Sequence, residues 1–458
     1  MYWKDDSRAA RHWKPQEEPL RVECTLCPRH CRPRPEQPGF CRVRGNVAGR
    51  LHTFNYGRSV QAAEETIETE AVYHYRPGSR ILSLGNVGCM MSCGFCHNWE
   101  TSQVKHLKAS SIHTYTPEEV VELAQAHGIE MLSWTYNDPV VWHEFVVDTA
   151  RLAARQGIRS LYKSAFYIEE EPARELCEVV DVFSLSLKSM SPEFYRKVTS
   201  GQLEPVLERI ELVHRSGRHL EISQLVVPEL NDQEQDARQT ARWVLDTLGP
   251  DVPLHFVRFH PAFRYTGVPR TPIETLVRAR DIAREEGIRH CYLGNVYRPG
   301  VSDTTCERCG TLQVARFGLT VRIEGIDGAG RCTGCGATSS IRDPFCGSRE
   351  VASTRELLAV RRELRFDWTE EVNSLHVVVP AEAVGIRFEV MRVPTGEVAG
   401  LDAGSGLHRL ILSRSSPQES GIVLRWNTED TVRFLPVLDR AHFPLFDSVD
   451  PAAAGTAY

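Results

Sequence analysis

Three closely spaced cysteines have the most distinctive chemistry in this sequence. Cys89, Cys93 and Cys96 follow a CxxxCxxC spacing, directly after the apolar segment 81–84 and a glycine-containing turn. Three thiolates can bind three irons of a 4Fe–4S cluster, so the fourth iron keeps an open position for a substrate or cofactor. Because a zinc site normally takes its ligands as two close pairs, this spacing favours such a cluster over zinc.

Two further groups of four cysteines also have the spacing of metal ligands. The first lies in a proline-rich segment with little hydrophobic periodicity, which needs a metal to become ordered, and zinc and an auxiliary iron–sulfur cluster both fit it. The second consists of two CxxCG pairs separated by 22 residues, which is typical of a structural zinc ribbon, with a rubredoxin-like iron site as the alternative. The two groups are Cys24, Cys27, Cys31 and Cys41, and Cys306, Cys309, Cys332 and Cys335.

Composition narrows the class of protein. The chain has 458 residues, enough for two or three domains, and a formal net charge of −6 that gives no electrostatic case for binding nucleic acid or an anionic membrane. No apolar run approaches the roughly 20 residues of a membrane span, and the first residues lack the apolar core of a signal peptide. We therefore expect a cytoplasmic protein, in which clustered cysteines bind metals rather than form disulfides.

Short apolar segments alternate with helical patterns between residues 79 and 300, which predicts an α/β fold with a mainly parallel sheet. The predicted strands are 130–135, 159–162, 182–187, 219–227, 254–259 and 289–293. The predicted helices are one that begins after the N-cap Thr116, and 141–156, 170–179, 203–216, 233–248 and 273–286. Asp138, the segment 163–165 and Lys188 follow predicted strands, where the chemistry of such folds collects.

Several stretches together resemble one known family. They are the N-terminal cysteine loop, the CxxxCxFCHNWE motif, Trp134–Pro139, Leu225–Asp232, Pro253–Pro261, Thr271–Leu276 and Gly294–Val296. This set is similar to radical S-adenosylmethionine (SAM) proteins of the AmmeMemoRadiSam type, which in turn resemble the pyruvate formate-lyase activating enzymes. The resemblance covers about residues 20 to 340. It implies a partial (β/α)6 barrel, one 4Fe–4S cluster with an open iron, and SAM as the second cofactor.

The resemblance also implies roles for individual residues. Cys89, Cys93 and Cys96 match the cluster ligands; Asp138 matches an acid near the SAM amino group, Lys188 the lysine of an Asp-x-Lys motif, and His260 a histidine near SAM. We take these last three as the catalytic candidates. Each also has a plainer explanation: a helix cap for Asp138, a solvated charge for Lys188 and a loop histidine for His260. The candidate cofactor-binding residues are Phe95, Asp138, Ser164, Ser186 and Lys188.

Two positions depart from the family pattern. Its Asp-Leu-Lys is Ser186-Leu187-Lys188 here, and its Thr-Asn-Gly is Lys163-Ser164-Ala165. An acid is lost and a cation is gained close to where the positive groups of SAM should lie. We therefore expect SAM to bind more weakly or to sit differently, unless another acid compensates.

The chain is predicted to contain four parts. Residues 1–78 form an N-terminal arm with the first cysteine group, 79–300 the partial barrel, and 301–345 the zinc-ribbon module. Residues 350–458 alternate apolar and polar side chains, which predicts an antiparallel β domain.

The leading functional hypothesis is a radical SAM enzyme. Its cluster would cleave SAM reductively to a 5′-deoxyadenosyl radical, which abstracts hydrogen from a small organic substrate, with a flavodoxin or ferredoxin as the external electron donor. One alternative is an activating enzyme that acts on a protein partner. A second is cleavage of another carbon–sulfur bond of SAM, which transfers a 3-amino-3-carboxypropyl group. A non-catalytic scaffold that binds RNA is disfavoured by the net charge and by the absence of a basic, aromatic stripe.

Overall fold

The computed structural model describes residues 4–107, 112–296, 298–317 and 319–344, and beyond them the strands between residues 356 and 438 together with residue 395. The chain divides into two compact units. The first is Met1–Gln61 with Glu65–Ser353, and the second is Ala62–Glu64 with Thr354–Tyr458. The finer division into four parts stays a prediction.

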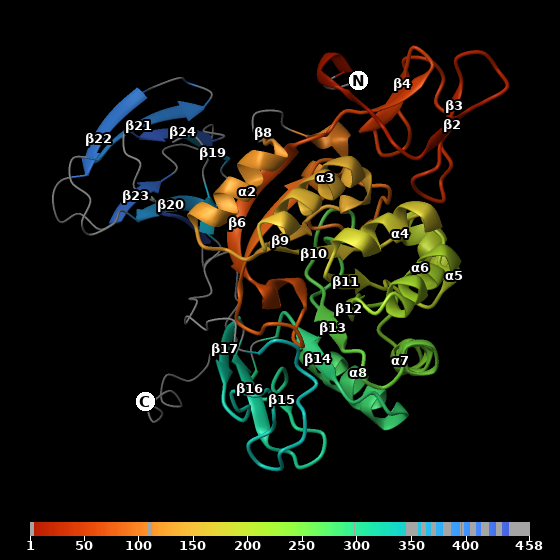
Figure 1. Cartoon of the computed structure of the whole chain (residues 1–458), viewed down its shortest axis with the longest axis vertical. Coiled ribbons are helices and arrows are strands. Elements are labelled where there is room, and N and C mark those ends of the chain that lie inside the picture. Colours follow the sequence, from red (N-terminus) through yellow and green to blue (C-terminus); the bar gives the residue numbers. More distant parts are fainter. Residues whose placement is uncertain are drawn as a thin grey trace. The chain divides into compact units, whose positions relative to one another are not determined.

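Parallel strands form the centre of the first unit, in the order β14-β13-β12-β11-β10-β9-β7 (Figure 1). They are β7 (Arg80–Asn86), β9 (Met131–Thr135), β10 (Arg159–Ser164), β11 (Val182–Ser186), β12 (His219–Val226), β13 (Leu254–Arg258) and β14 (Cys291–Gly294). Next to β7 lies β6 (Arg58–Thr66), which pairs with β8 (His113–Thr114). Because β14 ends the sheet, the sheet is open, which confirms the predicted α/β fold with a partial barrel.

Helices occupy the connections between these strands, as parallel pairing requires. They are α2 (Pro117–Ala126), α3 (His143–Arg155), α4 (Glu170–Val179), α5 (Pro192–Phe194), α6 (Glu204–Arg215), α7 (Glu234–Leu248) and α8 (Ile273–Glu286), and α1 (Trp99–Ser102) follows the cysteine loop. Figure 1 shows α4, α6, α7 and α8 along one side of the sheet. Thr116 caps α2 as predicted, since its hydroxyl accepts the Glu119 N–H at 3.2 Å.

The two faces of the sheet differ in polarity, because alternate residues of a strand point to opposite sides. On one face, Leu132 and Trp134 of β9 and Leu185 of β11 are buried apolar side chains. The other face has an apolar layer followed by a mostly buried polar layer. The apolar layer contains Ile81, Met131, Leu161 and Val182, and the polar layer contains Ser133, Thr135, Lys163, Ser184, Ser186, Glu221, Ser223 and His255.

Small antiparallel sheets flank the barrel at both ends of the first unit. The N-terminal strands, which the sequence analysis did not predict, are β1 (Arg8–Ala9), β2 (Trp13–Pro15), β3 (Val22–Cys24), β4 (Arg44–Val47) and β5 (Arg50–Thr53). The ribbon strands are β15 (Thr304–Thr305), β16 (Leu312–Phe317) and β17 (Thr320–Ile323). Val314, Ile326 and Ile341 form a small core within the ribbon.

The second unit contains antiparallel sheets in the orders β19-β24-β21-β22 and β18-β25-β20-β23, which confirms the predicted β structure. Its strands are β18 (Glu356–Leu358), β19 (Glu363–Asp367), β20 (Val372–Val378), β21 (Ile386–Val393), β22 (Val398–Ala403), β23 (Arg409–Ser413), β24 (Gly421–Trp426) and β25 (Arg433–Leu438). The predicted domain 350–458 also includes residues outside the described ones, among them 439–458.

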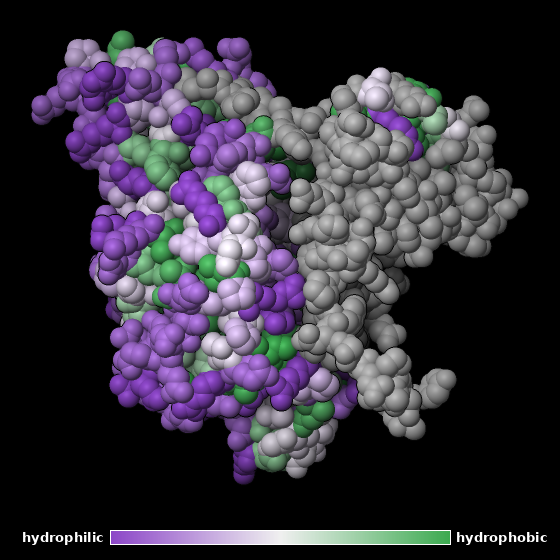
Figure 2. All heavy atoms as spheres, turned by 180° about the vertical axis from the view of Figure 1, so that it is seen from behind, coloured by the Kyte–Doolittle hydropathy of each residue, from purple (hydrophilic) through white to green (hydrophobic). Residues whose placement is uncertain are grey.

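Hydrophilic side chains predominate on the face of the described residues seen in Figure 2, with apolar side chains scattered among them. Across the part of the chain that the structure describes, we find no helix with the length and apolar character of a membrane span.

Candidate functional site

The CxxxCxxC loop follows β7 at the carboxyl edge of the parallel sheet. Backbone bonds hold it in place: Ser92 N–H donates to Thr199 O and Gly94 N–H to Val198 O, both at 3.0 Å. A Cβ at Gly94 would lie 2.4 Å from the ring of Tyr265, so any larger residue there would require this ring to move. Burial raises the pKa of the Cys93 thiol to about 11 and, with the charge of Asp138, that of Cys89 well above its usual value. A bound metal cation would lower these pKa values again, because metals bind the deprotonated thiolate.

Asp138 lies where β9 and β10 end, and both its carboxylate oxygens accept hydrogen bonds. The Ser164 hydroxyl donates to Oδ1 at 2.8 Å and the Ala165 N–H to Oδ2 at 2.8 Å. Asp138 also caps the short 3-10 helix 139–142. It is therefore both a helix cap, as its plainer explanation predicted, and an acid at the carboxyl edge of the sheet. Burial raises the pKa of Asp138, and the hydrogen bond from Ser164 opposes that rise. The structure thus joins two of the predicted cofactor-binding residues.

Lys188 supplies a cation on the same edge. Its backbone is fixed, since its N–H donates to the Tyr195 hydroxyl at 3.1 Å and its carbonyl accepts from Asn231 at 2.8 Å. Its ammonium lies 5.9 Å from the ring centroid of Phe95 and makes no hydrogen bond or ion pair with any residue that the structure describes. The charge of Lys188 lowers the pKa values of Cys93 and Asp138, although burial outweighs it in both. A half-buried ammonium of this kind can bind an anionic group of a ligand.

His260 follows β13 and contacts the cysteine loop through His97. The His97 ring nitrogen lies 2.8 Å from the carbonyl oxygen of His260, and the two rings meet edge to face at 5.8 Å. The structure therefore brings all three catalytic candidates, Asp138, Lys188 and His260, to the edge that carries the cysteines.

The two positions that depart from the family pattern are linked. Lys163 and Ser164 end β10 rather than follow it, because Lys163 pairs with Ser184 of β11. The Lys163 ammonium donates to the hydroxyls of Ser184 at 3.0 Å and Ser223 at 2.9 Å, and Ser186 contacts Ser223 at 3.2 Å. Burial lowers the pKa of Lys163 to about 8.

Glu70 supplies an acid beside this extra cation. It ends a short 3-10 helix, 67–70, and its carboxylate accepts the hydroxyls of Ser133 and Thr135, each at 2.9 Å. The charge of Glu70 raises the pKa of Lys163 and so opposes the effect of burial on that amine. Burial raises the pKa of Glu70 itself to about 7. The expected gain of one uncompensated positive charge is therefore reduced.

Sequence reasoning missed Glu70 and also Glu221, which lies on the same polar face. Both Glu221 oxygens accept hydrogen bonds, from His219 at 2.9 Å and His255 at 2.7 Å, and from the backbone N–H groups of residues 73 and 74. Polar residues at alternate positions of otherwise apolar strands, as in Ser184 and Ser186, were the available signal.

The ribbon cysteines have the separation of zinc ligands. Cys306 and Cys335 have sulfurs 3.7 Å apart, and those of Cys309 and Cys332 are 3.6 Å apart. Ligands at about 2.3 Å from a tetrahedral zinc lie roughly 3.8 Å from each other. The four residues can therefore hold a metal such as zinc.

The N-terminal cysteines are spaced more widely. No three of their sulfurs lie within 4.8 Å of one another, so a single tetrahedral ion does not fit them as they stand. They line one small cavity of about 20 Å³. Met90 of the cluster loop lines the same cavity, as does Arg44, which is paired with Glu144 at 2.8 Å. The members of the group are Cys24, Cys27, Cys31 and Cys41.

Comparison with known proteins identifies relatives. Residues 84–241 match the family described as the Radical SAM superfamily. The chain is 38% identical over 317 residues to an uncharacterized protein of Methanocaldococcus jannaschii, a match that covers 69% of this chain and 94% of that protein. It is 24% identical over 256 residues to the pyruvate formate-lyase 1-activating enzyme of Escherichia coli (strain K12), with coverage of 53% and 98%. A solved domain of a pyruvate-formate lyase-activating enzyme from Bacteroides vulgatus matches with a TM-score of 0.32 and 16% identity, over 35% of this chain and 97% of that one.

Proposed function

Because this chain belongs to the radical SAM superfamily and is an enzyme of that class, we propose that it starts radical chemistry on a small, polar organic substrate. The observation that carries the proposal is the gathering of Cys89, Cys93, Asp138 and Lys188 at the carboxyl ends of neighbouring parallel strands. A 4Fe–4S cluster and SAM, the cofactors of this family, supply a reductively generated carbon radical when bound. The electron comes from an external donor of the flavodoxin or ferredoxin class.

The residues of the site fit these cofactors by charge and donor type. Three thiolates from Cys89, Cys93 and Cys96 hold the cluster and leave one iron open. The buried carboxylate of Asp138 and the ammonium of Lys188 offer opposite charges to the amino and carboxylate groups of SAM. Phe95 covers the loop with an aromatic ring that is 4% exposed. His260 lies beside the loop and positions it through His97.

The buried polar layer supports a small polar substrate. Ser186, Ser223 and Lys163 present hydroxyl and amine groups on the inner face, next to the strand end that carries Lys188. A polar molecule bound above them would find hydrogen-bond partners in these groups.

An activating enzyme with a protein substrate is the second candidate, and the similarity to pyruvate formate-lyase 1-activating enzyme favours it. One experiment distinguishes the two candidate functions. A cell extract is divided by ultrafiltration into a low-mass filtrate and a protein fraction, and each is added to reconstituted enzyme with SAM and reductant. We expect the low-mass filtrate to raise 5′-deoxyadenosine formation and to carry substrate hydrogen into that product. If only the protein fraction does so, and protease treatment abolishes it, the second candidate replaces the first.

Cleavage toward 5′-deoxyadenosine is the second part of the proposal, because the cysteine loop, which sets the geometry of SAM, matches the family in full. Chromatography of the nucleosides tests it. Methylthioadenosine as the main product, dependent on reductant and on the cluster cysteines, would instead support transfer of an aminocarboxypropyl group.

Metals at the other two cysteine groups complete the proposal. The ribbon binds a structural zinc, supported by its sulfur separations. The N-terminal group holds an auxiliary iron–sulfur cluster rather than zinc, supported by the wider spacing of its sulfurs and the cavity between them. A variant in which Cys89, Cys93 and Cys96 are all alanine should then retain iron and sulfide after reconstitution. Loss of all iron from that variant would leave zinc as the N-terminal metal.

A further inference from the structure

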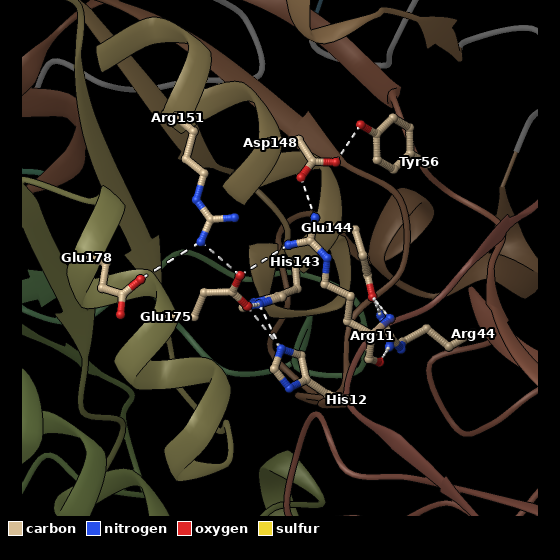
Figure 3. Close-up of polar contacts among 10 residues, drawn as sticks. All are labelled: Arg11, His12, Arg44, Tyr56, His143, Glu144, Asp148, Arg151, Glu175 and Glu178. Atoms are coloured by element: carbon tan, nitrogen blue, oxygen red, sulfur yellow. Dashed lines mark hydrogen bonds and ion pairs between the residues drawn. The ribbon is translucent and has the colours of Figure 1, made fainter. Parts of the chain in front are cut away.

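Two histidines and a glutamate, distant in the sequence, converge outside the site described above (Figure 3). His12 lies between β1 and β2 of the N-terminal segment, His143 begins α3, and Glu175 lies in α4. The Nε2 atoms of the two histidines are 3.1 Å apart, and Glu175 Oε2 lies 3.1 Å from His12 and 2.8 Å from His143. Three potential ligand atoms therefore form a nearly equilateral triangle. His143 is fully buried and His12 is mostly so.

Hydrogen bonds cannot form between all three pairs of atoms in this triangle at once. If both Nε2 atoms carry hydrogen, both can donate to Glu175, but the two N–H groups then face each other. If only one carries hydrogen, the lone pair of the other faces a carboxylate lone pair or is left with no donor. A metal cation accepts all three lone pairs at once. Its ligand atoms would lie roughly 3.3 Å apart around a tetrahedral zinc, close to the separations found.

The surrounding charges favour a cation. The other oxygen of Glu175, Oε1, accepts from Arg11 and Arg151, each at 3.2 Å, which orients the carboxylate with Oε2 toward the histidines. Around the triangle, four carboxylates face three guanidinium groups, so one negative charge is left over (Figure 3). The carboxylates are Glu144, Asp148, Glu175 and Glu178, and the guanidinium groups are Arg11, Arg44 and Arg151.

We propose that His12, His143 and Glu175 form a zinc site, distinct from the cysteine groups, that ties the N-terminal segment to α3 and α4 of the barrel. The ion would have three protein ligands and a water as the fourth. It would hold the segment that carries the N-terminal cysteines, because Cys24 of β3 pairs with Trp13, the residue after His12, and the Thr25 N–H donates to the His12 carbonyl at 2.8 Å.

Zinc analysis of the full-length protein tests this site. We expect His12→Ala and His143→Ala each to lose about one zinc per chain relative to the parent, while Glu171→Gln, an exposed residue one turn of α4 before Glu175 and outside this group of charges, loses none. A further Cys309→Ser substitution in the His12→Ala variant should remove a second zinc, which separates this site from the ribbon. Unchanged zinc in both histidine variants would overturn the proposal.

Anomalous diffraction at the zinc edge needs no variant and covers the case in which a substitution prevents folding. Crystals of the parent protein grown with zinc should show a peak between the three ligand atoms. A peak at the ribbon cysteines with none at His12, His143 and Glu175 would also refute the site.

Discussion

The hydroxyl of Ser164 donates to the carboxylate of Asp138 at 2.8 Å and so joins the ends of β10 and β9. The bond fixes an acid that burial would otherwise tend to protonate, on the edge that carries the three loop cysteines. In the proposed function this acid faces the amino group of SAM.

Loss of the Asp138 charge should weaken SAM binding. Asp138→Asn keeps the size of the side chain but removes the negative charge, and a charge-assisted hydrogen bond contributes roughly 1.5–3 kcal/mol, so we expect the Kd for SAM to rise at least tenfold. Ser164→Ala, which leaves the charge, should have a smaller effect. Equal affinity for Asp138→Asn and the parent, measured by calorimetry, would remove Asp138 from the SAM site.

An acid restored at position 186 should strengthen SAM binding. Ser186 contacts Ser223, which accepts from the Lys163 ammonium, so a carboxylate here would offset the cation that this chain has gained. We expect Ser186→Asp to lower the Kd for SAM roughly tenfold, which corresponds to about 1.4 kcal/mol. Ser186→Asn is the uncharged control of similar size. If both variants bind SAM alike, the electrostatic role of this position is wrong.

Zinc and stability should fall together in the ribbon. Cys309→Ser removes one ligand of a closed tetrahedral site, whose binding energy is also folding energy, so zinc content and melting temperature should both decrease. Cys177→Ser, outside the three cysteine groups and not a ligand of any proposed metal site, is the control. A variant that keeps its zinc would contradict a structural zinc at these four residues.

Glu221 should make stability depend on pH. Burial alone would raise its pKa, but hydrogen bonds from His219 and His255 hold the pKa well below its usual 4.5. A group whose pKa is lowered by folding stabilises the protein fully above its unfolded pKa and loses this effect progressively as the pH falls from that value through the lowered folded pKa. Glu221→Gln should therefore lower the free energy of unfolding by roughly 3 kcal/mol at pH 7, because His219 and His255 lose the buried carboxylate to which they are hydrogen-bonded.

Melting temperatures at pH 7 and at pH 4 or below check this prediction. The difference between the parent and Glu221→Gln should be large at neutral pH and should shrink on acidification. A difference that is the same at both values would show that the charge of Glu221 does not stabilise the fold.

Local signals predicted most of the barrel. The helical pattern and the glycine after it predicted helix 141–156, and α3 spans His143–Arg155. Asp138 and Lys188 were predicted at the carboxyl edge of the sheet because each follows a predicted strand. Glu221 was missed because only the register of β9 to β12 brings polar residues onto one face. Glu70 was missed because it reaches that face from a short 3-10 helix outside the strands. The contact between His12 and Glu175, 163 residues apart, depends on how the N-terminal segment packs, which no local pattern encodes.

The central claim is that Cys89, Cys93 and Cys96 hold a cluster that cleaves SAM. Its most direct test is the anaerobic reconstitution of Cys93→Ala beside the parent and a Cys177→Ala control, with nucleoside products measured after addition of SAM and reductant. We predict that the parent and the control form 5′-deoxyadenosine, and that Cys93→Ala binds less iron and forms none. Full iron content and full SAM cleavage in Cys93→Ala would contradict the account.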